Sequence, residues 1–143
     1  MTGRLFATAV LLLAALATAT AREIKASPEV AAMVTQCAQR YDMPETLLHS
    51  VIRRESGYNA GARHGPYWGL MQIRVDTARG VGYRGAGQGL LDPATNLTYG
   101  GAYLANAWRV SGGKQARAMS LYRGGYYYEA KRKGMLKELI RIP

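Results

Sequence analysis

The pattern of apolar residues predicts a helix that begins near Pro44 and ends at Gly57. Four of its side chains recur at i, i+3, i+4 and i+7 and therefore share one face. They are Leu48, Val51, Ile52 and Glu55. This face is apolar until its last member, so Glu55 points in the direction of the core. Pro44 suits the first helical position, and we expect Asp42 to cap the free amides of the first turn.

The same spacing predicts five further helical segments. They cover residues 27–40, 77–81, 93–111, 114–122 and 126–142, the last with a break at Gly134. We expect Ser27, Asp76 and Asp92 to cap the first three of these segments, two of which have proline at the first helical position. No stretch shows sustained alternation of apolar and polar residues, so β-structure should be minor. The pattern favours an all-α protein with one domain.

The position of Glu55 makes little sense for stability. A carboxylate at a helix C-terminus opposes the helix dipole, at a cost of about 0.3–1 kcal/mol. On an apolar face, desolvation also raises the pKa of the carboxyl group. A carboxylic acid that stays protonated near neutral pH suits a general acid. The alternative is a structural glutamate paired with Arg53, Arg54 or another nearby basic residue, and the helix alone does not separate the two interpretations.

Four motifs then follow in order: ESGYN at 55–59, GLMQI at 69–73, NLTYGGAYL at 96–104 and LYRGG at 121–125. Together they resemble the lytic transglycosylase family, whose fold is related to that of goose-type lysozyme. The resemblance covers roughly residues 43–125. It implies a lysozyme-like helical domain with a glycine-rich substrate cleft.

The resemblance also implies a reaction and a set of site residues. The family cleaves the β-1,4 bond between N-acetylmuramic acid and N-acetylglucosamine in peptidoglycan and forms a 1,6-anhydro sugar, without metal or cofactor. Glu55 would be the general acid and base. Gln72 and Tyr122 would contact the sugar from opposite walls, with Tyr122 touching the acid itself. The remaining expected contacts are Met71 and Leu121, which would line the cleft, and Ser56, which would steady the end of the catalytic helix.

Two residues depart from the family pattern. The family usually has Ala-Tyr-Asn before its last glycine, and Arg123 replaces the asparagine here. The family often carries a serine about midway between Glu55 and GLMQI, where this chain has His64. Asn96 matches a family position, but local hydrogen bonding explains it as well as sugar contact does.

Glycoside hydrolysis usually takes two carboxylates, and no second catalytic acid is indicated. The other acidic residues fall at helix starts, in the N-terminal tail or in the basic C-terminal tail. The loop at 57–69 is rich in aromatic residues, which commonly line saccharide clefts. We interpret Tyr58 as a packing residue. For Tyr67 and Trp68 the sequence does not decide between packing in the core and lining the cleft.

The first 21 residues have the pattern of a signal peptide. Arg4 supplies a positive charge, residues 5–16 are apolar, and Ala-Thr-Ala at 19–21 suits cleavage after Ala21. The alternative is an uncleaved anchor. Cleavage would leave residues 22–143 as one exported domain, periplasmic or secreted. Cys37 is the only cysteine, and we expect it to be a buried thiol and not a lipid attachment site.

The formal net charge is +10, which attracts polyanions. In an exported protein these are the carboxylates of peptidoglycan, whereas nucleic acid is disfavoured by the signal peptide. Residues 131–133, Lys-Arg-Lys, are interpreted as a solvated helix face. We expect a monomer, and a partner in an envelope secretion complex or flagellum stays open.

Three alternatives accompany the main prediction. A muramidase of lysozyme type would use the same residues with water as acceptor. A wall-binding protein would keep the cleft without turnover. A basic structural or nucleic-acid-binding protein is disfavoured by the set Glu55, Gln72 and Tyr122.

Overall fold

The computed structural model describes residues 25–143, so the signal peptide expected at 1–21 lies outside the described residues. The helices are α1 (Pro28–Arg40), α2 (Glu45–Ser56), α3 (Val75–Gly80), α4 (Pro93–Val110), α5 (Gln115–Gly124) and α6 (Tyr127–Arg132). The strands β1 (Arg63–His64), β2 (Tyr67–Trp68) and β3 (Ile73–Arg74) form a small antiparallel sheet in that order. Two 3-10 turns, η1 (Gly87–Leu91) and η2 (Leu136–Glu138), complete the described elements. The prediction of a predominantly helical protein is confirmed.

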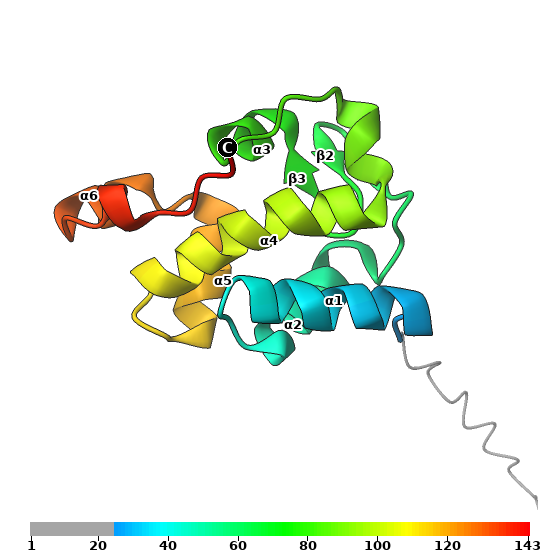
Figure 1. The fold of residues 1–143 in the computed structure, drawn as a ribbon, viewed down its shortest axis with the longest axis horizontal. Coiled ribbons are helices and arrows are strands. Elements are labelled where there is room, and N and C mark those ends of the chain that lie inside the picture. Colours follow the sequence, from blue (N-terminus) through cyan, green and yellow to red (C-terminus); the bar gives the residue numbers. More distant parts are fainter. Residues whose placement is uncertain (1–24) are drawn as a thin grey trace, which may run out of the picture.

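Helix α4 is the centre of the fold. It crosses the middle of the molecule, with α1 on one side and α3 and the strands on the other (Figure 1). Asp92 caps it as predicted, because its carboxylate accepts a hydrogen bond from the amide of Thr95 at 2.8 Å. A side chain at Gly101 would collide with the sulfur of Cys37. Glycine here therefore lets α1 pack closely against α4.

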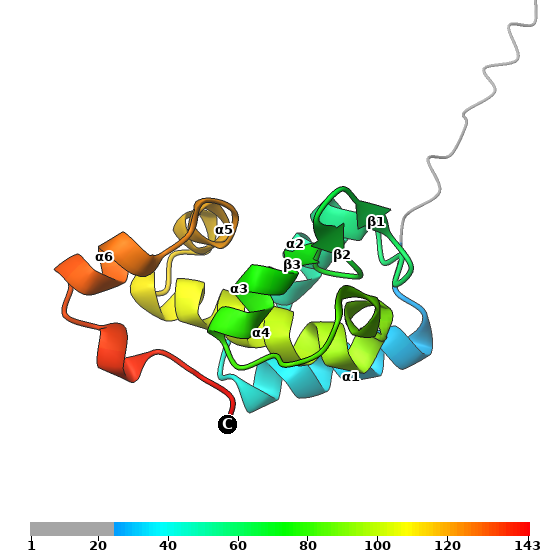
Figure 2. The same cartoon turned by 90° about the horizontal axis from the view of Figure 1, so that it is seen from above.

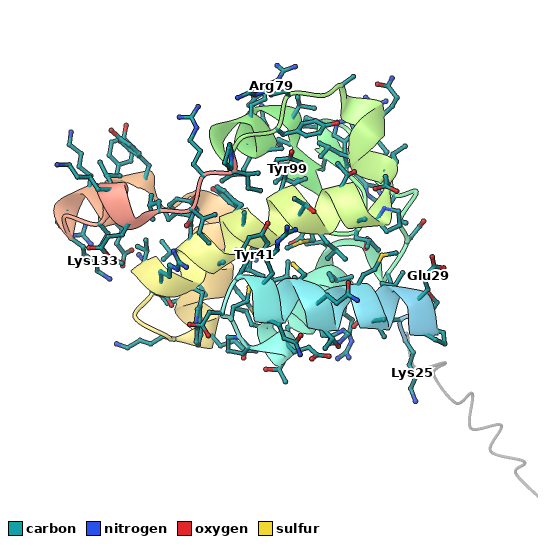
Figure 3. The ribbon with its side chains drawn as sticks, viewed as in Figure 1. Lys25, Glu29, Tyr41, Arg79, Tyr99 and Lys133 are labelled. Carbon is teal, nitrogen blue, oxygen red and sulfur yellow. The ribbon has the colours of Figure 1, made fainter. Side chains whose placement is uncertain are left out.

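Helix α1 closes one side of the core. Ser27 caps it as predicted, by accepting a hydrogen bond from the amide of Val30 at 3.2 Å. Cys37 is buried, as expected, and desolvation raises the pKa of its thiol to about 12. Tyr41, between α1 and α4 in Figure 3, donates a hydrogen bond to the carbonyl of Thr98 at 2.8 Å.

Two expected helix caps, Asp42 and Asp76, are wrong, and Pro44 precedes its helix although it was expected at the first helical position. Asp42 does not cap α2: it lies in a turn at φ 51°, and Pro44 takes the cap position without a side-chain hydrogen bond. Asp76 is inside α3, where it pairs with Arg74 at 3.2 Å instead of capping. Both caps fail because each helix begins one or two residues away from the start that the sequence pattern predicts.

The tail is helical only in its first part. After α6 and the short turn η2, residues 139–143 are not helical, and the amide of Ile142 donates to the carbonyl of Val81. The buried Asn106 fixes this segment, since its side chain both donates to the carbonyl of Ile140 and accepts from its amide. Tertiary contacts thus replace the helical hydrogen bonds that the pattern predicted. Among the residues described, no helix is long and apolar enough to cross a membrane.

Candidate active site

Glu55 lies in the last turn of α2, half-buried at the edge of the core. Gly57 ends the helix in the left-handed conformation, at φ 58°. Within the described residues the Glu55 carboxylate forms no hydrogen bond and no ion pair. Burial raises its pKa, and the guanidinium groups of Arg123 and Arg54 oppose this rise. The arginine pairing considered from the sequence is therefore present only as a longer-range electrostatic interaction.

The GLMQI loop is held from below by Asn96 on α4. The side-chain oxygen of Asn96 accepts from the amide of Met71 at 2.9 Å, and its nitrogen donates to the carbonyls of Trp68 and Leu90, both at 2.8 Å. Asn96 is fully buried, so local hydrogen bonding accounts for it. A side chain at Gly69 would collide with Asn96 and with the backbone of Leu90. Gly69 is therefore needed for the close approach of the two segments.

Gln72 sits in the loop at φ 48°, with its side chain almost buried. Its amide nitrogen donates to the carbonyls of Ala62 at 3.1 Å and Gly69 at 2.9 Å, which uses both of its hydrogens. Its oxygen lies 2.8 Å from Nδ1 of His64, so that nitrogen must carry the hydrogen. Gln72 can then only accept a hydrogen bond from a bound ligand. The departure at His64 thus has a structural partner.

Tyr122 approaches from α5, opposite α2. Its hydroxyl donates to the carbonyl of Met71 at 2.7 Å, which ties α5 to the GLMQI loop. The hydrogen bond goes to this carbonyl and not to Glu55, in contrast to the contact expected from the sequence. Glu55 is nevertheless close enough to act on Tyr122, since burial and the nearby Glu55 charge raise the pKa of Tyr122 well above its usual value.

Three expected site residues lie behind the site. The side chains of Met71 and Leu121 are buried in the core cluster and do not belong to the cavity wall. Ser56 donates a hydrogen bond to the carbonyl of Leu70 at 2.7 Å, so it joins the end of α2 to the GLMQI loop. The structure therefore brings Glu55, Gln72 and Tyr122 to one cavity and places the other three residues in its support.

The cavity has a volume of about 860 Å³. Its lining residues come from α2, α3, α4, α5 and the sheet, and Figure 2 shows α5 apart from α3 and the strands, on the other side of the molecule's centre. Its lining residues are Arg54, Glu55, Tyr67, Gln72, Ile73, Arg74, Thr77, Tyr103, Ala116, Met119, Ser120, Tyr122, Arg123 and Gly124. Glu55 is the one acidic side chain among these described residues.

Several lining residues were missed from the sequence. Tyr103 lies on α4 inside the motif at 96–104, whose presence could have singled it out, whereas Thr77 lies on α3 outside the four motifs. The sequence left open whether Tyr67 and Trp68 lie in the core or in the cleft, and the burial of their side chains separates them. Tyr67 is 44% exposed and lines the cavity, whereas Trp68 is buried beneath the guanidinium of Arg63 at 3.7 Å. Over the described part of the chain, no group of three or more His, Cys, Asp or Glu side chains could hold a metal ion.

The structure thus has a predominantly helical domain with Glu55 and Tyr122 lining one cavity. The chain belongs to the transglycosylase SLT domain family, whose model matches residues 32–138. No solved structure matches the chain.

Curated relatives match a shorter stretch. The chain is similar to the membrane-bound lytic murein transglycosylase C proteins of Klebsiella pneumoniae (strain 342) and Salmonella typhi, with 35% identity over 81 residues. The match covers 51% of this chain and 22% of each relative. The chain therefore corresponds to about a fifth of the length of these relatives.

Proposed function

We propose that the protein is a peptidoglycan lytic transglycosylase with Glu55 as its general acid and base. The observation that carries this proposal is the half-buried carboxylate of Glu55, without a hydrogen-bond partner among the described residues, facing a large cavity. Membership of the transglycosylase SLT domain family supports the reaction class. The names of the curated relatives support murein as the substrate.

In the proposed reaction Glu55 first protonates the glycosidic oxygen between N-acetylmuramic acid and N-acetylglucosamine. The raised pKa of Glu55 favours the protonated form that this step needs. The N-acetyl group of the substrate stabilises the positive charge at the anomeric carbon, so no second carboxylate is required. Glu55 then removes the proton of the C6 hydroxyl, which closes on the anomeric carbon and gives the 1,6-anhydro sugar.

Gln72 and Tyr122 would position the sugar from opposite walls. Gln72 would accept a hydrogen bond from a sugar hydroxyl, because its amide hydrogens are already donated to the backbone. The hydroxyl oxygen of Tyr122 has lone pairs left after donation to Met71. It could therefore accept a hydrogen bond from protonated Glu55 or from the substrate. Ser56, Met71 and Leu121 would act by holding these groups in place.

We propose that the protein works on the cell wall after export. Residues 1–21 have the composition of a signal peptide, and the high positive charge suits the carboxylates of peptidoglycan. Residues 22–143 would form the exported domain. A role in general wall turnover and a role beside a secretion apparatus are both compatible with this reaction.

The test is a digest of purified peptidoglycan with the wild-type protein and with Glu55→Gln, followed by mass spectrometry of the muropeptides. We expect anhydro-muramic ends from the wild type and a loss of activity of at least ~100-fold in the variant, as for removal of a general acid. Reducing ends would instead identify a muramidase that uses water. If neither protein cleaves the wall while both bind it, the protein is a wall-binding protein and the proposal fails.

A further inference from the structure

Basic side chains surround the proposed acid on both sides of the cavity. Arg54 precedes Glu55 on α2, and Arg123 follows Tyr122 on α5. Both line the cavity, and both are exposed at its rim. Arg74 also lines it, but its guanidinium is engaged by Asp76 at 3.2 Å. The cavity therefore carries an excess of positive charge over the single carboxylate of Glu55.

In the described part of the chain, neither Arg54 nor Arg123 is engaged by another side chain. Within residues 25–143, no hydrogen bond or ion pair holds either guanidinium. The two side chains reach the same cavity from different helices, α2 and α5, and both act electrostatically on the Glu55 carboxylate. Guanidinium groups with free donors in one cavity suit a carboxylate, which accepts planar, bidentate hydrogen bonds.

The positive charge of Arg54 and Arg123 also opposes protonation of Glu55, unless an anion neutralises this charge. A nearby guanidinium stabilises the ionised form of Glu55 and so works against the protonation that burial favours. A bound anion between Arg54 and Arg123 would remove this effect when the substrate is in place.

We propose that Arg54 and Arg123 form a subsite that binds a carboxylate of the glycan substrate beside Glu55. This proposal rests on the proposed function and adds a determinant of substrate preference to it. The carboxylate has two possible sources on the muramic acid residue. It is the lactyl group on strands without peptides, and it belongs to the stem peptide on strands that carry one.

The experiment measures cleavage of four substrates by the full chain. They are glycan strands with stem peptides, the same strands after enzymatic removal of the peptides, and both preparations after methyl esterification of their carboxylates. The proteins are wild type, Arg123→Gln, Arg54→Gln and Arg132→Gln. The last is the control, because Arg132 is an exposed arginine of α6 that does not line the cavity. It makes the same change of charge away from the site.

We expect Arg123→Gln to raise KM about tenfold on strands with free carboxylates, the loss expected for one charge-assisted hydrogen bond. On the esterified strands we expect Arg123→Gln and wild type to be equal, and wild type to lose activity by a similar factor. Arg54→Gln should behave in the same way, and Arg132→Gln should match wild type throughout. A loss limited to strands with peptides assigns the stem carboxylate, and a loss limited to bare strands assigns the lactyl group.

The proposal is overturned if Arg123→Gln loses the same factor on native and esterified strands, or loses nothing on either. Thermal unfolding of each variant checks the fold, and an exposed side chain such as Arg123 should change it little. If wild type cleaves none of the substrates, the proposed function fails. The subsite is then tested by calorimetric binding of bare strands, where Arg123→Gln should again bind about tenfold more weakly than Arg132→Gln.

Discussion

At the scale of a single residue, two effects act in opposite directions on the pKa of Glu55. Burial at the end of α2 favours the neutral acid, and Arg123 and Arg54 favour the carboxylate. Burial is the larger influence, so the pKa lies above its ordinary value. The structure has thus placed an ionisable group where ionisation is disfavoured, and no described hydrogen bond relieves this. Such a group is typical of a functional site and contributes little to stability.

This position predicts how stability depends on pH. Because the pKa of Glu55 is higher in the folded state than in the unfolded state, folding disfavours the charged form. Glu55→Gln should therefore be more stable than wild type at neutral pH. The difference should shrink as the pH falls through the folded pKa, and vanish below the unfolded pKa, where both forms are neutral. Urea unfolding at several pH values measures it, and a gap that widens toward low pH would contradict the assignment.

At the scale of elements, the site depends on contacts between segments far apart in the chain. Tyr122 of α5 joins the GLMQI loop through the carbonyl of Met71, and Ser56 of α2 joins it through the carbonyl of Leu70. Asn96 of α4 supports the same loop from the core through three hydrogen bonds. Three helices therefore fix one short loop, and the position of Gln72 follows from them.

The loop support predicts a strong effect of Asn96→Ala. The change removes one buried hydrogen bond each from the amide of Met71 and the carbonyls of Trp68 and Leu90, at roughly 1–3 kcal/mol for each group. We expect unfolding free energy to fall by more than about 3 kcal/mol, as measured by urea denaturation. Asn59→Ala is the control, because Asn59 is exposed and its side chain accepts only from Gly61. Equal losses in the two variants would refute the role of Asn96.

At the scale of the whole molecule, charge is the dominant property. The sequence carries 19 basic and 9 acidic residues, and three arginines gather at the cavity. The exposed end of α6 adds Lys131 and Arg132, and Lys133 follows in the next turn. Lys133 also donates to the carbonyl of Val110 and pairs with Glu129 at 2.9 Å. The interpretation of residues 131–133 as a solvated helix face therefore does not describe Lys133, which contacts other parts of the protein.

The net charge predicts that binding to peptidoglycan depends on salt. Exposed charges are screened over about 8 Å at physiological ionic strength and about 3 Å at 1 M. We expect the fraction of Glu55→Gln protein that sediments with purified wall to fall severalfold between 0.05 and 0.5 M NaCl, roughly as the screening length shortens. Chitin, which lacks carboxylates, is the control, and binding to it should change little. Salt-independent binding to wall would show that charge does not drive the association.

Much of the fold follows from local patterns in the sequence. The helices, the caps Ser27 and Asp92, and the position of Glu55 at a helix end depend on residues within one or two turns of each other. A spacing of 3.6 residues can therefore reveal them. The motifs also predicted that Gln72 and Tyr122 would reach the same cavity as Glu55, and the geometry agrees.

Other features depended on the tertiary structure alone. The tail leaves its helical pattern because Asn106, 34 residues away, binds the backbone of Ile140. Met71 and Leu121 lie in the core although they stand in the motifs, since packing decides which side of a loop or helix faces the cavity. The sequence by itself determined the main helices and the position of Glu55 at the end of one of them. Which side chains surround Glu55 was decided by contacts between distant segments, because no short-range pattern encodes a contact across dozens of residues.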